Sequence, residues 1–295
     1  MSGTPPAEVN IDEPLIRRLL REQHPDLAPL PCVPVDAGWD NVMVRLGDEL
    51  CLRLPRRQYA ADLIVSEQTW LPCLSSSLPL PTPVPRRVGV PGCGYPWRWS
   101  IVSWLPGVTA DLAAPVSGEA TPLGAFLKAL HVPAPAGAPT NPVRGVPLIQ
   151  RATQVTDRMQ RLAKQSVPAL TPDVHRIWEE ALTAPIDVDA TWIHGDLHAR
   201  NVLVERGTLA GIIDWGDMAS GDRATDLASI WMLFADPDAR ARALSTSGSI
   251  SQATYLRAQG WAVLFGVTLL DTGLVDHPQH AAMGEWTLRR VVAGP

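Results

Sequence analysis

The sequence predicts an α+β chain with two lobes, a small strand-rich lobe followed by a larger and mostly helical one. Two observations support this prediction. Apolar and polar residues alternate over 41–54, as in strands that bury one face, whereas helical periodicity dominates after Pro106-Gly107. The chain has 295 residues, enough for one large domain or for two lobes. We expect an N-terminal lobe over 1–102, a hinge over 103–107 and a C-terminal lobe over 108–295.

The first lobe is expected to begin with a helix and a hairpin. A helix is predicted over 12–23, because a proline lies in its first turn and apolar residues share one face. Strands are predicted at 41–46 and 49–54, with a Gly-Asp turn between them. A second helix is predicted at 60–74, where apolar residues again recur at helical spacing.

Prolines dominate the next segment. Six of them fall between residues 79 and 96, and proline cannot donate a hydrogen bond to a strand ladder. This segment is therefore expected to be extended, edge or turn structure. The apolar run at 98–105 is predicted to be the last strand of the lobe.

The second lobe is expected to consist of helices and one short hairpin. The hairpin is predicted from strands at 202–204 and 209–213, with a turn at Arg206-Gly207. Helical patterns recur at 120–131, 148–164, 172–182, 222–235, 237–246, 251–270 and 279–292.

Composition and charge narrow the class of protein. The formal net charge is −5 without a basic run, so neither nucleic acid nor an anionic membrane is expected as a partner. The N-terminus lacks the pattern of a signal peptide, and the longest apolar stretch, 261–270, is too short to span a bilayer. The four cysteines form no C-x-x-C pair, which favours free thiols in a reducing cytoplasm over zinc. The sequence does not fix the oligomeric state.

The stretch from 192 to 217, WIHGDLHARNVLVERGTLAGIIDWGD, carries the clearest chemical signal. Asp196 is followed five residues later by Asn201, and Asp214 follows the predicted hairpin. Kinase phosphoryl transfer uses this order: one carboxylate accepts the proton of a hydroxyl, and an amide oxygen and a second carboxylate hold Mg²⁺. Each residue alone is better explained as part of a capped turn. The three together, in this order, favour phosphoryl transfer.

The same stretch resembles the aminoglycoside phosphotransferase family, which has a protein-kinase-like fold. HGDLHARN and IIDWGD match the family's catalytic and metal-binding loops, and the resemblance extends to GDRATDLA, LGAFLKALH and the N-terminal GWDNVMVRL and LCLRLPRR. It implies that Asp196 is the catalytic carboxylate and that Asn201 and Asp214 bind Mg²⁺. It also implies ATP or GTP as cofactor, without distinguishing between them.

The N-terminal lobe departs from the family at one position. Arg53 stands where the family usually has a lysine that contacts the nucleotide phosphates, and Glu67 is its expected partner. Arginine is always charged and binds phosphate, so an active variant is favoured, although a non-catalytic nucleotide-binding protein remains the alternative. Gly38 is a candidate for the nucleotide loop, and the backbone from Ser103 to Leu105 is expected to bond the base.

The acceptor is expected to be a small molecule with a hydroxyl group, first of all an aminoglycoside-like antibiotic. In this family the later helices form the acceptor pocket, and acidic side chains there would suit a cationic acceptor. The candidates are Asp217, Asp226, Asp271 and Glu285. For each one alone a cap or a solvated face is the favoured explanation, and Asp226 in TDLA could simply hydrogen-bond the catalytic loop. A macrolide, another metabolite or hydrolysis of the nucleotide are the other possibilities.

Overall fold

The computed structural model describes residues 6–37 and 40–295, and the chain divides into two compact units. The first unit comprises Met1–Ser76 and Pro81–Leu105, and the second comprises Ser77–Leu80 and Pro106–Pro295. The division after Leu105 falls inside the segment 103–107 that the sequence predicts as a hinge. The assignment of Ser77–Leu80 to the second unit is not foreseen from the sequence.

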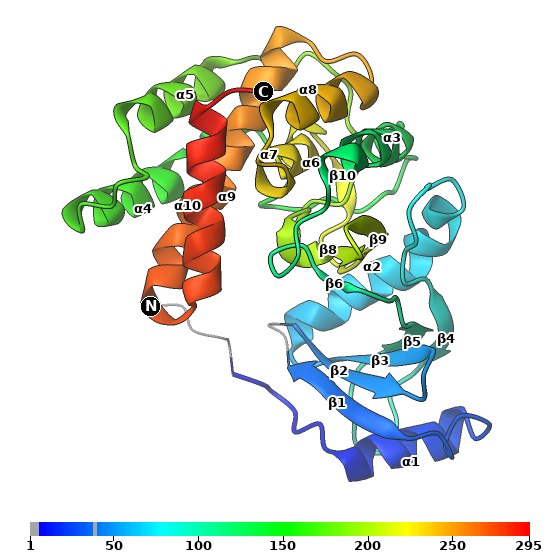
Figure 1. Cartoon of the computed structure of the whole chain (residues 1–295). Coiled ribbons are helices and arrows are strands. Elements are labelled where there is room, and N and C mark those ends of the chain that lie inside the picture. The colour runs from blue at the N-terminus through cyan, green and yellow to red at the C-terminus, as the bar shows by residue number, and fades with distance from the viewer. Residues whose placement is uncertain (1–5, 38–39) are drawn as a thin grey trace. The chain divides into compact units, whose positions relative to one another are not determined.

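The first unit contains a five-stranded antiparallel sheet (Figure 1). Its strand order is β1 (Cys32–Ala37), β2 (Asn41–Leu46), β3 (Leu50–Pro55), β5 (Trp99–Ser103) and β4 (Pro85–Gly89). The predicted hairpin is β2–β3, and the predicted strand at 98–105 is the shorter β5. The sequence does not predict β1, whereas β4 lies in the proline-rich segment that is predicted to be extended, edge or turn structure. Both are edge strands and both contain proline, which an edge tolerates because one side needs no ladder hydrogen bond.

Two helices lie on opposite faces of this sheet (Figure 1). Helix α1 (Glu13–Gln23) begins where the Asp12 side chain accepts a hydrogen bond from the Leu15 amide at 2.9 Å. Its buried leucines pack in one core with Leu52 and Leu54 of β3. Because side chains alternate along a strand, Arg53 points to the other face, where helix α2 (Gln58–Ser75) lies.

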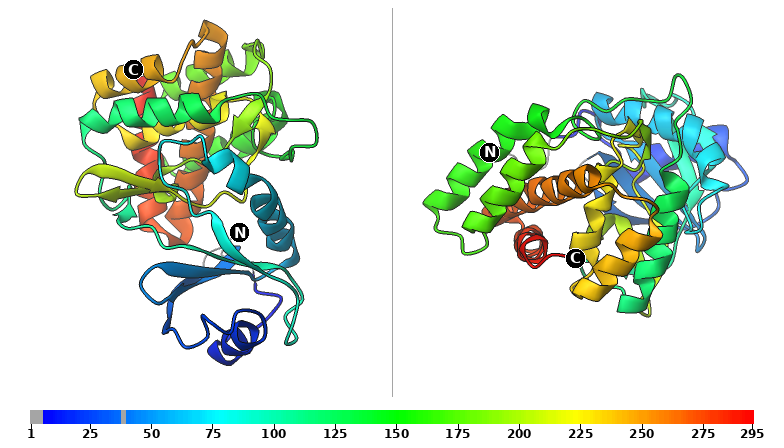
Figure 2. Two further views of the ribbon diagram at one scale, coloured as in Figure 1. Left: turned by 90° about the vertical axis from the view of Figure 1, so that its right-hand side faces the viewer. Right: turned by 90° about the horizontal axis from the view of Figure 1, so that it is seen from above.

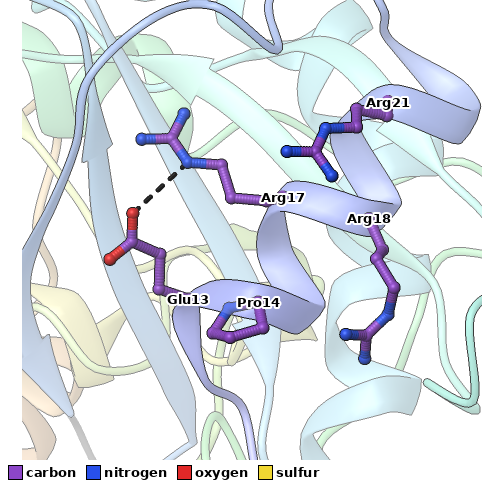
Figure 3. A pocket seen from close by; sticks show the side chains of 5 residues that line it. All are labelled: Glu13, Pro14, Arg17, Arg18 and Arg21. Carbon is purple, nitrogen blue, oxygen red and sulfur yellow. Dashed lines mark hydrogen bonds and ion pairs between the residues drawn. The ribbon is translucent and has the colours of Figure 1, made fainter.

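The outer side of α1 is basic. Glu13, Pro14, Arg17, Arg18 and Arg21 line a hollow of about 450 Å³ there (Figure 3). Arg17 is engaged, because it pairs with Glu13 and donates to the carbonyl oxygens of Ala28 and Leu30.

The second unit is mainly helical (Figures 1 and 2). Its long helix α9 packs against α10, α5, α6 and α4. The helices are α3 (Ala120–Leu130), α4 (Ala152–Lys164), α5 (Pro172–Thr183), α6 (Ala224–Leu227), α7 (Ser229–Leu233), α8 (Pro237–Thr246), α9 (Gln252–Asp276) and α10 (Pro278–Val292), with short 3₁₀ turns at Ser117–Glu119, Leu148–Arg151 and Ala199–Asn201. The prediction of a single helix over 222–235 is wrong. Two short helices occupy it, and they start only after the Asp222 side chain accepts a hydrogen bond from the Ala224 amide.

Helix α9 is longer than predicted and extends over 25 residues. It is the one helix, among the residues that the structure describes, whose length and composition would allow it to cross a membrane. In this structure 67% of its most apolar window is buried inside the unit, as expected for a core helix.

Two small sheets position the polar residues of the second unit. The predicted hairpin is formed by β8 (Val202–Glu205) and β9 (Thr208–Ile212), and β6 (Val108–Thr109) pairs with β8. Strand β7 (Thr191–Ile193) pairs antiparallel with β10 (Ala219–Gly221). The candidate residues Asp196, Asn201, Asp214 and Asp217 all lie in the segments that enter or leave these strands.

Candidate active site

Asp196 lies on the loop that leaves β7. Gly195 has φ +85°, and a Cβ atom there would lie 2.5 Å from the carbonyl oxygen of Asp217, so the loop requires glycine. The amide nitrogen of the Asn201 side chain donates to the Asp196 carbonyl oxygen at 2.8 Å. This hydrogen bond closes a turn over the five positions that separate Asp196 from Asn201. It ends in the Ala199–Asn201 3₁₀ turn that leads into β8.

An arginine and a histidine contact the Asp196 carboxylate. Nη2 of Arg144 lies 2.6 Å from Oδ1, and Nε2 of His198 lies 3.4 Å from Oδ2. Burial opposes the ionised form of Asp196, but the charge of Arg144, followed by that of His198, outweighs it. Together they hold the pKa of this carboxyl well below its usual range. Asp196 is thus ionised and able to accept a hydrogen bond from a hydroxyl group.

Asn201 and Asp214 both lie at the open end of the β8–β9 hairpin, where Asn201 precedes β8 and Asp214 follows β9. The Ile213 amide donates to the Asn201 carbonyl oxygen at 2.9 Å, which fastens the end of β9 to the start of β8. Asp214 is exposed and has φ +61°, a strained conformation for a residue other than glycine and one found often at functional sites. Trp215 behind it is fully buried, and its indole nitrogen donates to the Ile212 carbonyl oxygen at 3.0 Å.

The donor groups of Asn201 and Asp214 fit Mg²⁺. The Asn201 side-chain nitrogen is used within the loop, so its amide oxygen is the atom left for a cation, and Asp214 adds a carboxylate. Oxygen donors of this kind suit a hard cation that keeps several waters. Among residues 6–37 and 40–295, no three His, Cys, Asp or Glu residues form a cluster that would bind zinc or another metal through protein ligands alone.

Asp226 holds in place the loop that carries Asp196. Its carboxylate has no exposed surface, and it accepts hydrogen bonds from the His194 amide at 2.7 Å and the Gly195 amide at 2.9 Å. The ring of His131, at the end of α3, lies 3.3 Å from the same carboxylate. The structure thus bears out the alternative for Asp226, a hydrogen bond to the loop of Asp196, and contradicts its assignment to the acceptor, because both carboxylate oxygens are bonded within the protein.

The other three predicted acceptor residues have different surroundings. Asp217 accepts a hydrogen bond from the Asn141 amide at 2.7 Å; burial, with the charge of Asp196, raises its pKa to about 6. Asp271 on α9 is paired with Arg158 and Arg161 of α4, both at 2.7 Å. Glu285 on α10 pairs with Arg289. Asp217 is thus the member of the set that lies beside the catalytic loop.

Arg144 is the side chain in contact with Asp196 that sequence reasoning missed. It belongs to a proline-rich segment without helical or strand periodicity, and it lies 52 positions before the carboxylate that it contacts. The one available signal was an isolated arginine beside a glycine in that segment.

The nucleotide candidates belong to the first unit. Arg53 and Glu67 form a buried ion pair, with 4% and 1% of their surfaces exposed, so the predicted partnership is present. Ser103 ends β5, where its hydroxyl accepts a hydrogen bond from Arg86 at 2.9 Å, and Leu105 is half-buried at the end of the unit. Gly38 lies outside the described residues.

The comparisons with known proteins agree on one family. The profile of the phosphotransferase enzyme family matches residues 31–261. Aminoglycoside 3′-phosphotransferases of Salmonella typhimurium and Escherichia coli are each 28% identical over 189 residues, which cover 62% of this chain and 68% of theirs.

Solved structures show the same fold at lower identity. The GDP complex of wild-type aminoglycoside 2′-phosphotransferase-IIIa has a TM-score of 0.65 at 18% identity, covering 96% of this chain and 99% of that one. Macrolide 2′-phosphotransferase type I has a TM-score of 0.58 at 21% identity, covering 95% and 98%. These results confirm the resemblance and the protein-kinase-like fold that it implied. The chain belongs to the phosphotransferase enzyme family.

Proposed function

We propose that this protein transfers the γ-phosphate of Mg²⁺-bound ATP or GTP to a hydroxyl group of a small-molecule antibiotic. One observation carries the proposal: Asp196 is ionised on a loop that Asp226 holds in place, and Asn201 and Asp214 lie next to it at the open end of the β8–β9 hairpin. In this proposal Asp196 accepts the hydrogen bond of the acceptor hydroxyl and orients its oxygen toward the phosphate. Mg²⁺ held by Asn201 and Asp214 would neutralise the charge of the nucleotide phosphates.

The proposal gives Arg53 the role of the phosphate-contacting cation. Its pairing with Glu67 supports this role, because the pair fixes a charged group on a central strand of the first unit. Relatives of the fold have been solved with GDP and with ADP, which supports a nucleotide as the phosphate donor. Because such nucleotides are cytoplasmic and all four cysteines are free, we propose the cytoplasm as its compartment.

The first candidate for the acceptor is an aminoglycoside, on the strength of the curated relatives. The state of the acidic residues favours a second candidate, a macrolide or another acceptor with fewer positive charges. Asp271 is neutralised by two arginines, Glu285 is paired and Asp226 is buried. A polycationic acceptor would therefore meet paired or buried carboxylates at three of the four candidate positions.

Mass spectrometry of reaction mixtures tests the proposal. Purified protein with MgCl₂ and either ATP or GTP is incubated with a panel of aminoglycosides and macrolides, and we expect one acceptor class to gain a single phosphoryl group. Asp196→Asn, which keeps the shape of the side chain but removes its charge, should abolish the gain. If the wild-type protein modifies neither class, or if Asp196→Asn is as active as the wild type, the proposal is wrong.

A further inference from the structure

Hydrogen bonds hold residues 141–145, the segment that carries Arg144, in place on both sides of Arg144; we call this segment the platform. Asn141 is buried, and its side-chain oxygen accepts hydrogen bonds from the amides of Val143 at 2.9 Å and Arg144 at 3.0 Å, closing an Asx turn. The nitrogen of the same side chain donates to Asp217 at 2.7 Å. The N-terminal side of Arg144 is thereby fixed to the segment that connects Asp214 to β10.

The C-terminal side of Arg144 is fixed as firmly. The Gly145 amide donates to the Thr225 hydroxyl at 3.2 Å, and its carbonyl oxygen accepts from the Asp222 amide at 2.9 Å. Gly145 has φ +65°, and a Cβ atom there would lie 2.5 Å from Ile193 and 2.9 Å from the Cα atom of Gly221. The platform thus packs directly on β7 and β10, and β7 is the strand that leads to Asp196.

The guanidinium of Arg144 is held between an aromatic ring and the carboxylate. Its central carbon lies 4.8 Å from the centre of the Phe265 ring on α9, at the distance of a cation–π contact. One of its nitrogens bonds Oδ1 of Asp196 at 2.6 Å, whereas the contact of His198 with Oδ2 is longer, at 3.4 Å. The two carboxylate oxygens are therefore unequal: Oδ1 bonds a permanent cation at 2.6 Å, whereas Oδ2 has the longer and weaker contact with His198.

We propose that Arg144 is a positioning residue of phosphoryl transfer: it fixes the Oδ1 edge of Asp196 so that Oδ2 receives the hydrogen bond of the acceptor hydroxyl. This inference rests on the proposed function of the site. Arg144 acts through Asp196. Without it, the carboxylate rotates among several orientations, and the acceptor oxygen is no longer held in line with the phosphate.

Steady-state kinetics of Arg144→Gln, Arg144→Met and Arg144→Lys test the role, with the acceptor that gains a phosphoryl group in the mass-spectrometric panel. We expect the two neutral variants to lower kcat by about 100-fold, the scale of a misplaced reacting group, with KM for the nucleotide unchanged. Arg144→Lys should recover part of this loss, because it restores the charge without the planar shape. Arg176→Gln, which removes an exposed arginine on α5, is the matched control and should behave as the wild type.

A double-mutant cycle gives a second readout that needs no acceptor. Melting temperatures of the wild type, Arg144→Gln, Asp196→Asn and the double variant report whether the two side chains interact in solution. The loss in Tm from Arg144→Gln should be at least halved in the Asp196→Asn background. Additive losses would overturn the contact itself. Unchanged or increased kcat in folded Arg144 variants would overturn the positioning role, while an inactive wild type would instead refute the proposed function.

Discussion

Replacement of Asp226 gives the sharpest test of how the catalytic loop is held. Hydrogen bonds to a charged group contribute about 1.5–3 kcal/mol each. The Asp226 carboxylate accepts two from buried backbone amides. Asp226→Ala leaves both amides without a partner and removes the partner of His131, which we expect to lower the free energy of unfolding by about 4 kcal/mol. Asp226→Asn keeps the shape but turns an NH₂ group toward one amide, so about 2 kcal/mol is expected.

Urea unfolding followed by circular dichroism measures the loss, with Asp189→Asn as control because Asp189 is an exposed aspartate of the same unit. In the folded Asp226→Asn variant, kcat should also fall at least tenfold, since the loop before Asp196 is loosened. A residue that bound the acceptor would behave differently, raising the acceptor KM without a loss of stability. That pattern, or wild-type stability in both Asp226 variants, would refute the bracing role.

Three further predictions concern other parts of the chain. Gly145→Ala should lower the free energy of unfolding by about 3 kcal/mol, because Gly145 combines a left-handed backbone with close packing. Gly137→Ala should lower it by only about 1 kcal/mol, because Gly137 has φ +86° but open space around it. Equal losses in urea unfolding would contradict the packing argument. Arg53→Ala should raise the nucleotide KM about tenfold or more and Arg53→Lys much less, because lysine keeps the charge beside Glu67; an unchanged nucleotide KM in both would exclude Arg53 as the phosphate contact. Cys51 should resist iodoacetamide at pH 8 in the native protein while the exposed Cys73 is alkylated, because burial raises the pKa of the Cys51 thiol to about 11; peptide mapping would reveal the opposite order if this is wrong.

Local signals predicted the parts of the fold whose partners are near in sequence. Helix α1 begins at a capping aspartate followed by proline, and the β2–β3 and β8–β9 hairpins join neighbouring segments through short turns. Strand β1 was missed, and β4 was predicted only as extended, edge or turn structure, because their place in the sheet depends on edge pairing rather than on alternation, which their prolines obscure.

The same distinction applies to the site. Asp196, Asn201 and Asp214 lie within one continuous stretch, so their order alone indicated their chemistry. Arg144 and Asp226 reach the catalytic loop from 52 and about 30 positions away, through contacts that depend on how loops pack on β7 and β10. For this reason the sequence left Asp226 between contact with the acceptor and a hydrogen bond to the catalytic loop: an acidic residue in sequence gives no indication of whether its oxygens are already bonded to backbone amides.

Helix α9 also affects how the chain reaches its native state during synthesis. Its apolar surface is covered in part by α10, whose Met283, Leu288 and Val291 are buried and which is translated after it. Until those residues leave the ribosome, a helix with the composition of a membrane span is exposed to chaperones, to membranes and to other nascent chains. A stop codon between α9 and α10 would therefore leave the catalytic stretch intact in sequence and still remove the side chains that cover α9.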